Sequence, residues 1–146
     1  MRRLTGLCGE TLASRYLQRH NFALWKRNWR CKRGELDILA VKNRTLHIVE
    51  VKTRIRGAHR FTPLDQMSDH KRKKLEYLGR TLLRDEAVGL RRRRIRAVQI
   101  DFIGIELFFR GFLPRYTILH LLDIVPLERT RPHYGWHKEA SYYYTH

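Results

Sequence analysis

The chain has 146 residues, with 31 Lys and Arg against 14 Asp and Glu, which gives a formal charge of +17 at pH 7 and a pI of about 10.8. This length suits one domain with a real core, and so large a basic excess is the usual sign of a nucleic-acid partner. Two cysteines are too few for a disulfide framework, and no apolar segment suits a signal peptide or a membrane span, so we expect a cytoplasmic protein with no membrane partner.

The predicted elements alternate without an obvious linker. Helical spacing of apolar residues predicts a first helix over 4–20, and residues 23–29, 35–41 and 46–53 read as strands. A second helix follows over 67–84, and two further strands over 96–105 and 115–122. The order αβββαββ predicts an α/β domain over 1–122, in which helices flank a sheet and the second helix provides a crossover. Residues 123–146 show no clear period, and we expect an irregular C-terminal tail there.

The most informative stretch consists of GELDILAV and LHIVEVKTR on either side of the turn-like KNRT. If the loop is centred on residues 43–44, the numbers of paired residues sum to 87, so that Asp37 faces Glu50 and Glu35 faces Lys52. Directly opposed like charges are destabilising unless something positive lies between them. A hard divalent cation, Mg²⁺ or Mn²⁺, would serve, because such ions take carboxylate oxygens and substrate phosphates as ligands.

A solvated ladder of salt bridges across the two strands is the alternative, and for an isolated match of this kind it is the commoner outcome. Period-two alternation puts Lys52 on the same face as Glu50, so its ammonium would point toward the proposed ion. The rest of the chain has to decide between the two interpretations.

Three basic clusters, at 26–33, 71–74 and 91–96, bracket the acidic pair in the sequence. Neutralisation of phosphates is their natural use, although a run of arginines is often only a solvated patch. Trp25, Trp29 and Phe61 lie among basic residues and could stack on bases, but an aromatic residue in a strand more often belongs to the core. The candidate nucleic-acid-binding residues are Arg30, Arg54, Lys71, Lys74, Arg91, Arg92, Arg93 and Arg94.

Several separated blocks carry a resemblance to a known family. They are GLCGETLASRYL, NWR at 28–30, GELDILA at 34–40, VEVKTR at 49–54 and a basic helix that begins near Lys71. Over residues 5–122 the chain resembles the YraN family of restriction-endonuclease-like proteins. Asn21 stands where that family commonly has a glycine, an exchange that is tolerable because Asn also reaches positive φ.

The resemblance implies the PD-(D/E)xK nuclease fold, with a central mixed sheet, similar to archaeal Holliday-junction resolvases and type II restriction enzymes. It implies that Asp37 and Glu50 hold Mg²⁺, with the Val51 carbonyl as a further ligand, and that Lys52 is the catalytic lysine. Glu10 matches the acid that the first helix adds to the catalytic site. For Glu10 alone, stabilisation of the helix dipole is the alternative.

These observations predict a metal-dependent endonuclease that hydrolyses phosphodiester bonds in nucleic acid, with DNA, including branched or junction DNA, as the first substrate to test. A module that binds nucleic acid without cutting it stays open as an alternative, as does an RNA-processing factor with a nuclease-like fold. The sequence leaves open whether the protein works as a homodimer.

Overall fold

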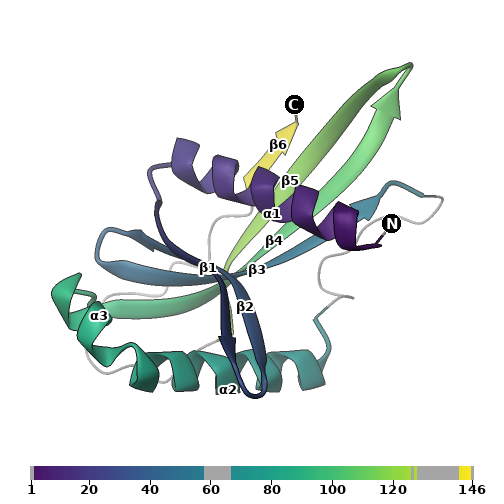
Figure 1. The fold of residues 1–146 in the computed structure, drawn as a ribbon. Helices are drawn as coiled ribbons and strands as arrows, with labels where there is room; N and C mark the ends of the chain where they lie inside the picture. Colours follow the sequence, from purple (N-terminus) through teal and green to yellow (C-terminus); the bar gives the residue numbers. More distant parts are fainter. Residues whose placement is uncertain (1, 58–66, 126, 128–141, 146) are drawn as a thin grey trace.

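The computed structural model describes residues 2–57, 67–125, 127 and 142–145, and Figure 1 shows their arrangement. The elements in chain order are α1 (Arg2–Arg19), β1 (Ala23–Cys31), β2 (Gly34–Lys42), β3 (Thr45–Ile55), α2 (Asp69–Asp85), α3 (Ala87–Arg92), β4 (Ala97–Arg110), β5 (Leu113–Val125) and β6 (Tyr142–Thr145). The predicted α/β class and the order αβββαββ are confirmed. Beyond the prediction, the structure has α3 and β6 as additional elements and longer strands at β4 and β5.

The strands form one six-stranded mixed sheet in the order β1-β2-β3-β4-β5-β6. Of the described strands, β3 and β4 alone run parallel, because α2 and α3 carry the chain back across the sheet between them. The other neighbouring strands are antiparallel. Of the segment expected as an irregular tail, residues 123–125 continue β5 and β6 pairs with β5. The remainder of that segment, except Leu127, lies outside the described residues.

Two separate cores cover the two faces of the sheet. On one face, Leu75, Leu78 and Leu82 of α2 pack against a cluster that includes Ile48 and Phe102. On the other face, Ala13, Tyr16 and Leu17 of α1 pack against Ile38, Val49 and Ile103. Period-two alternation in β3 therefore sends its even-numbered residues toward α2 and its odd-numbered residues toward α1. Among the described residues, no helix is long and apolar enough to cross a membrane.

Local turn chemistry determines the β2–β3 hairpin. Asn43 and Arg44 both have positive φ, of 50° and 61°, which is the geometry of the two-residue type I′ loop that matches strand twist. Paired residues run from Lys42 opposite Thr45 to Ile38 opposite Val49, so the predicted register is confirmed over this span. Asn21, which follows α1, likewise has a positive φ, of 63°. This is the conformation expected where Asn replaces the family's glycine.

A buried polar network braces the centre of the sheet. Asp101 of β4 is fully buried and lies at an irregularity in the β4–β5 pairing. One of its oxygens lies 2.7 Å from His47 Nδ1 and 3.1 Å from His120 Nε2, and the other accepts hydrogen bonds from Gln99 Nε2 and the Asp123 N–H. Burial by itself would raise the pKa of Asp101, but the hydrogen bonds from His120 and His47 hold it well below its ordinary value. This carboxylate therefore ties β3, β4 and β5 together.

Candidate active site

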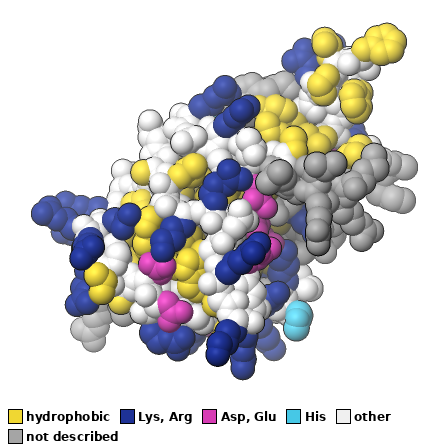
Figure 2. Space-filling view, viewed as in Figure 1, with side chains coloured by type: hydrophobic (Ala, Val, Ile, Leu, Met, Phe, Trp, Pro, Cys, Tyr) yellow, Lys and Arg dark blue, Asp and Glu magenta, His cyan; other side chains and the backbone are white. Residues whose placement is uncertain are grey.

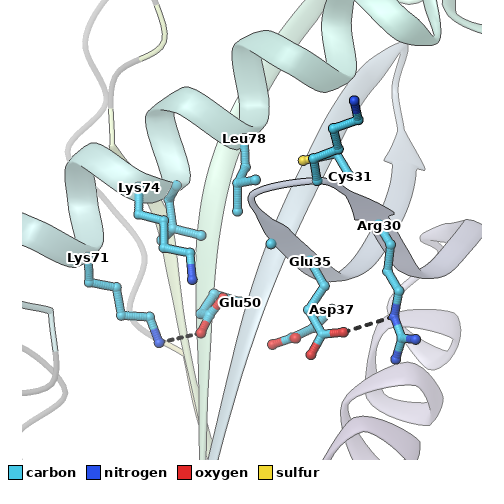
Figure 3. Close-up of a pocket in the computed structure, with 11 residues that line it drawn as sticks. Arg30, Cys31, Glu35, Asp37, Glu50, Lys71, Lys74 and Leu78 are labelled. Atoms are coloured by element: carbon cyan, nitrogen blue, oxygen red, sulfur yellow. Dashed lines mark hydrogen bonds and ion pairs between the residues drawn. The ribbon is translucent and has the colours of Figure 1, made fainter.

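The acidic pair lies at the point where β2 and β3 separate. The backbone pairing between them ends at Ile38 and Val49, and one residue further along, Asp37 Oδ2 accepts a hydrogen bond of 2.7 Å from the Val51 N–H. This bond holds the Asp37 carboxylate beside β3, where Glu50 extends toward the same space (Figure 3). The predicted meeting of Asp37 and Glu50 is thus achieved by a side chain bound to the backbone of the opposite strand.

The environment of Asp37 makes its ionisation costly near neutral pH. Burial, together with the charges of Glu50 and Glu10, raises the pKa of Asp37 to about 7. The Val51 N–H and the ammonium of Lys71 act in the opposite direction but do not compensate for it. A carboxylate whose charge is poorly compensated is a site that a bound cation would stabilise.

Helix α2 contributes basic side chains to this space. The side-chain oxygen of Ser68 caps α2 by accepting from the Lys71 N–H at 3.3 Å, which places Lys71 in the first turn. From there the Lys71 ammonium forms an ion pair with Glu50 (Figure 3), and Lys74 follows one turn later. The sequence predicted both lysines as nucleic-acid-binding, and the structure places them directly beside the acids.

Together these residues line an open cleft of about 540 Å³. Its walls include Arg30, Gly34 and Glu35 from the β1–β2 hairpin, Asp37 and Glu50 from the sheet, and Lys71 and Lys74 from α2. A cleft of this size that combines two acids with a basic rim can admit a phosphate backbone, which the lysines and the arginine would neutralise.

Gly34 makes room for one of the lysines. A Cβ on Gly34 would lie 3.1 Å from Lys74 Cε and 3.3 Å from Leu78 Cδ1, both closer than side chains normally approach. The absence of a side chain at residue 34 therefore lets the end of the Lys74 side chain pack close to the β1–β2 hairpin.

Glu35 and Lys52 do not form the predicted cross-strand pair. Glu35 instead accepts a hydrogen bond of 3.1 Å from Arg30 Nε on β1, and the β2–β3 pairing has already ended at Ile38. Lys52 is exposed and opposite Gly104 of β4, and it is not among the residues that line the cleft. The divergence of the two strands after Ile38 is the reason, because it removes the facing position that the register assigned.

Glu10 approaches the acids from the other side of the sheet. It lies on α1, where its Oε2 is 3.5 Å from Arg27 Nη2, and its charge contributes to the raised pKa of Asp37. The close approach depends on Gly9, since a Cβ there would lie 1.6 Å from Thr53 Oγ1. Glu10 does not line the cleft. It therefore lies near Asp37 on the α1 face of the sheet, apart from the side chains of α2.

The other predicted nucleic-acid-binding residues lie away from the cleft. Arg54 Nη2 donates to Glu106 at 3.1 Å, which neutralises its charge within the sheet. Arg91 and Arg92 form the last turn of α3, and Arg93 stacks over Trp25 at 4.5 Å, while Arg94 follows in a positive-φ turn. This run is therefore a separate basic surface beyond the end of α2.

The two tryptophans near the first cluster are structural. Trp25 and Trp29 pack against the α2-side core, and Trp29 Nε1 donates a hydrogen bond of 3.1 Å to Glu86. The expectation that strand aromatics belong to the core is thus confirmed for both tryptophans, whereas Phe61 lies outside the described residues.

The donor set fits a hard divalent cation that is completed by substrate. No three His, Cys, Asp or Glu side chains converge on a single point in the part of the chain that the structure describes. Asp37 and Glu50 would supply two carboxylate ligands, and a backbone carbonyl such as that of Val51 a third. Mg²⁺ is commonly bound by one or two carboxylates together with water and phosphate oxygens, and the raised pKa of Asp37 supplies the electrostatic reason for an ion there.

Comparison with known proteins agrees with the sequence blocks. A model of the family described as uncharacterised protein family UPF0102 matches residues 9–105. The chain belongs to the UPF0102 family. This is the YraN family that the blocks resembled, and the matched span contains Glu10, Asp37, Glu50 and Lys52.

Curated relatives carry the same family description. A UPF0102 protein of Nocardioides sp. is 36% identical over 107 residues, which cover 73% of this chain and 81% of the relative. A UPF0102 protein of Acidothermus cellulolyticus is 41% identical over 86 residues, or 59% of this chain and 64% of the relative. A UPF0102 protein of Rhodococcus opacus is 34% identical over 118 residues, with coverage of 81% and 92%.

Proposed function

We propose that this protein is a metal-dependent endonuclease that hydrolyses phosphodiester bonds in nucleic acid, with DNA as its first substrate class. The observation that carries the proposal is the pairing of Asp37 with Glu50 at a basic cleft, with a pKa of about 7 at Asp37. An ionic ladder on an open sheet face would leave both acids near solvent. Here the Asp37 carboxylate is instead held by the Val51 N–H, and its negative charge is not fully compensated by the groups around it.

Asp37, Glu50 and the Val51 carbonyl would hold Mg²⁺ or Mn²⁺. When bound, such an ion polarises a phosphoryl oxygen and lowers the pKa of a bound water. The remaining roles belong to the chain itself. Lys71, Lys74 and Arg30 bind the phosphates on either side of the cut, and Lys52, which does not line the cleft, neutralises charge at the reacting phosphate once substrate is bound. Glu10 tunes the charge of Asp37 from the α1 side.

The decisive experiment is a cleavage panel of branched, duplex and single-stranded DNA and RNA, with Mg²⁺ and Mn²⁺ each tested against EDTA. Wild-type protein should cut at least one substrate only with a divalent ion. Asp37→Asn should abolish cutting, because Asn lacks the charge that holds the ion, while Asp85→Asn on the exposed end of α2 should cut normally. Cutting in EDTA, or unchanged cutting by Asp37→Asn, would refute the proposal.

The ion pair between Lys71 and Glu50 favours a second candidate, a module that binds nucleic acid without cutting it. In that case the lysine is the permanent partner of Glu50, and the cleft only neutralises phosphates. The same panel distinguishes the two functions, since this module would bind with the usual dependence on salt and leave every substrate intact. A preference for structured RNA over DNA in competition would instead indicate an RNA-processing role.

A further inference from the structure

The β4–β5 hairpin extends beyond the rest of the sheet (Figure 1). The last pairing of β4 with β3 is Leu107 opposite Ile55, and the described pairing of β5 with β6 begins at Thr117. Among the described residues, those at 108–115 pair only with each other, down to Arg110 opposite Leu113. The two loop residues are Gly111, with a φ of 62°, and Phe112. Positive φ at the first loop position is the type II′ geometry.

The end of this hairpin carries large apolar side chains in full contact with solvent. Phe109 is 71% exposed, Phe112 is 102% exposed and Leu113 is 60% exposed. A type II′ loop needs a glycine at its first position, and its second position accepts polar residues. The turn itself therefore does not explain Phe112. Neighbouring exposed apolar residues of this kind usually mark a surface that contacts a partner.

The charge around the tip determines which partner fits. Residues 107–116 contain Arg110 and Arg115 and no acidic residue, in a chain of net charge +17. Figure 2 shows hydrophobic side chains gathered at this projecting end with basic side chains beside them. A second copy would bring like charges together at the contact, whereas a polyanion would be attracted. Aromatic rings next to arginines are also the combination that stacks on exposed bases while binding the backbone.

We propose that the hairpin tip, consisting of Phe109, Phe112 and Leu113, stacks on unpaired bases, so that the preferred substrate is DNA with a single-stranded stretch next to a duplex. This rests on the proposed function and specifies its substrate. Apolar side chains of this kind wedge against base steps that are already open, and a continuous duplex offers no such face without the cost of unstacking.

The sheet gives the distance between the tip and the cleft. Glu50 lies opposite Phe102 in the register of β3 and β4, and the hairpin ends at Arg110. Eight residues of strand at roughly 3.3 Å each span about 26 Å, which corresponds to about eight base pairs at 3.4 Å. A nucleic acid that contacts both the tip and the acids would have its unpaired bases about eight nucleotides from the cut.

The test measures binding in EDTA by fluorescence anisotropy, so that it does not depend on cleavage. The probes are a duplex with a single-stranded tail and a fully paired duplex of the same length. Phe112→Ser should weaken binding to the tailed duplex by about 5- to 150-fold, the range for loss of one stacked base, and should leave binding to the paired duplex within about twofold. Because Phe112 is entirely exposed, the substitution removes no contact that the fold needs.

Two further variants complete the design. Val88→Ser removes another exposed apolar side chain, on α3, where Val88 is 54% exposed, and should bind both probes as the wild type does. Phe112→Trp should retain affinity, and its added fluorescence should be quenched by the tailed duplex alone. Equal effects of Phe112→Ser on the two probes, or no effect on either, would overturn the proposal. So would a wild-type dimer in sedimentation that Phe112→Ser dissociates, because the tip would then contact a second copy.

Failure of this inference can be told apart from failure of the proposed function. If the wild type prefers the tailed duplex through Phe112 but cuts nothing with Mg²⁺ or Mn²⁺, the nuclease activity is wrong and the stacking surface stands. If the wild type cuts DNA and Phe112→Ser binds both probes normally, the stacking surface is wrong and the nuclease stands.

Discussion

Replacing Asp37 with asparagine should stabilise the metal-free protein at pH 8, although Asp37 is the central residue of the candidate site. The wild-type carboxyl, whose pKa is raised by burial and by Glu50 to about 7, is ionised at pH 8 in an environment that disfavours the charge. Asparagine keeps nearly the same shape, and its side-chain oxygen can accept the Val51 N–H bond. It removes the charge that repels Glu50.

The expected size follows from linkage between ionisation and folding. The unfolded chain releases the Asp37 proton near its ordinary pKa of 3.8, whereas the folded chain keeps it up to about pH 7. Between these values, rising pH favours the unfolded wild type by up to about 1.4 kcal/mol per pH unit. The advantage of Asp37→Asn should therefore grow from near zero at pH 4 to a plateau above pH 7. Its upper limit is about 4 kcal/mol, and solvent that reaches the half-buried group reduces it.

The assay is urea unfolding in EDTA at each pH unit from 4 to 8, comparing the free energy of unfolding of Asp37→Asn with that of the wild type. Asp85→Asn is the matched control, because Asp85 is an exposed carboxylate beside Arg84, and its effect should stay within about 0.5 kcal/mol. An asparagine variant that is no more stable than the wild type at pH 8, or a difference that does not change with pH, would refute the reasoning.

Three other changes test different parts of the structure. Asp101→Asn should destabilise the protein by about 3–5 kcal/mol in urea unfolding at pH 7, because it breaks a buried charged network. Since the folded-state pKa of Asp101 is lowered, the wild type should lose this stabilisation as the pH falls below about 4. An equal effect of the substitution at pH 3 and pH 7 would contradict the assignment. Gly9→Ala should cost about 1–3 kcal/mol in the same assay, since its Cβ would overlap Thr53, whereas Gly57→Ala, with nothing within 4 Å, should be nearly neutral. Lys52→Ala should bind DNA and metal almost normally but cut about 10² to 10³ more slowly in single-turnover kinetics; cutting at the wild-type rate would show that Lys52 has no role in the chemistry.

The half-buried Asp37 and the fully buried Asp101 should respond to pH in opposite directions. The pKa of Asp37 is raised by burial and by neighbouring acids, so its ionisation works against folding as pH rises toward 7. The pKa of Asp101 is lowered because His120 and His47 bond to its ionised form, so its charge favours folding above about pH 4. The incompletely compensated charge of Asp37 beside the cleft suits ligand binding. The fully hydrogen-bonded charge of Asp101 inside the sheet suits stability.

The sequence by itself determined the features that depend on neighbouring residues. Alternation of apolar residues and the Asn43–Arg44 turn specified the β2–β3 hairpin and its register as far as Ile38 opposite Val49, one residue short of Asp37 and Glu50. The sequence also predicted the second helix over 67–84, which the structure has as α2 over Asp69–Asp85. These predictions succeeded because turn geometry and side-chain periodicity act over a few residues, and no distant contact overrode them.

Tertiary structure decided which groups surround the acids and which remain outside the site. The pairing of Lys71 with Glu50 depends on how α2 crosses the sheet, and the exclusion of Lys52 from the cleft depends on the separation of β2 from β3. The His47–Asp101–His120 network joins three strands. In each case the contact joins residues far apart in the chain, and its geometry follows from how helices pack on a twisted sheet, which local periodicity does not encode.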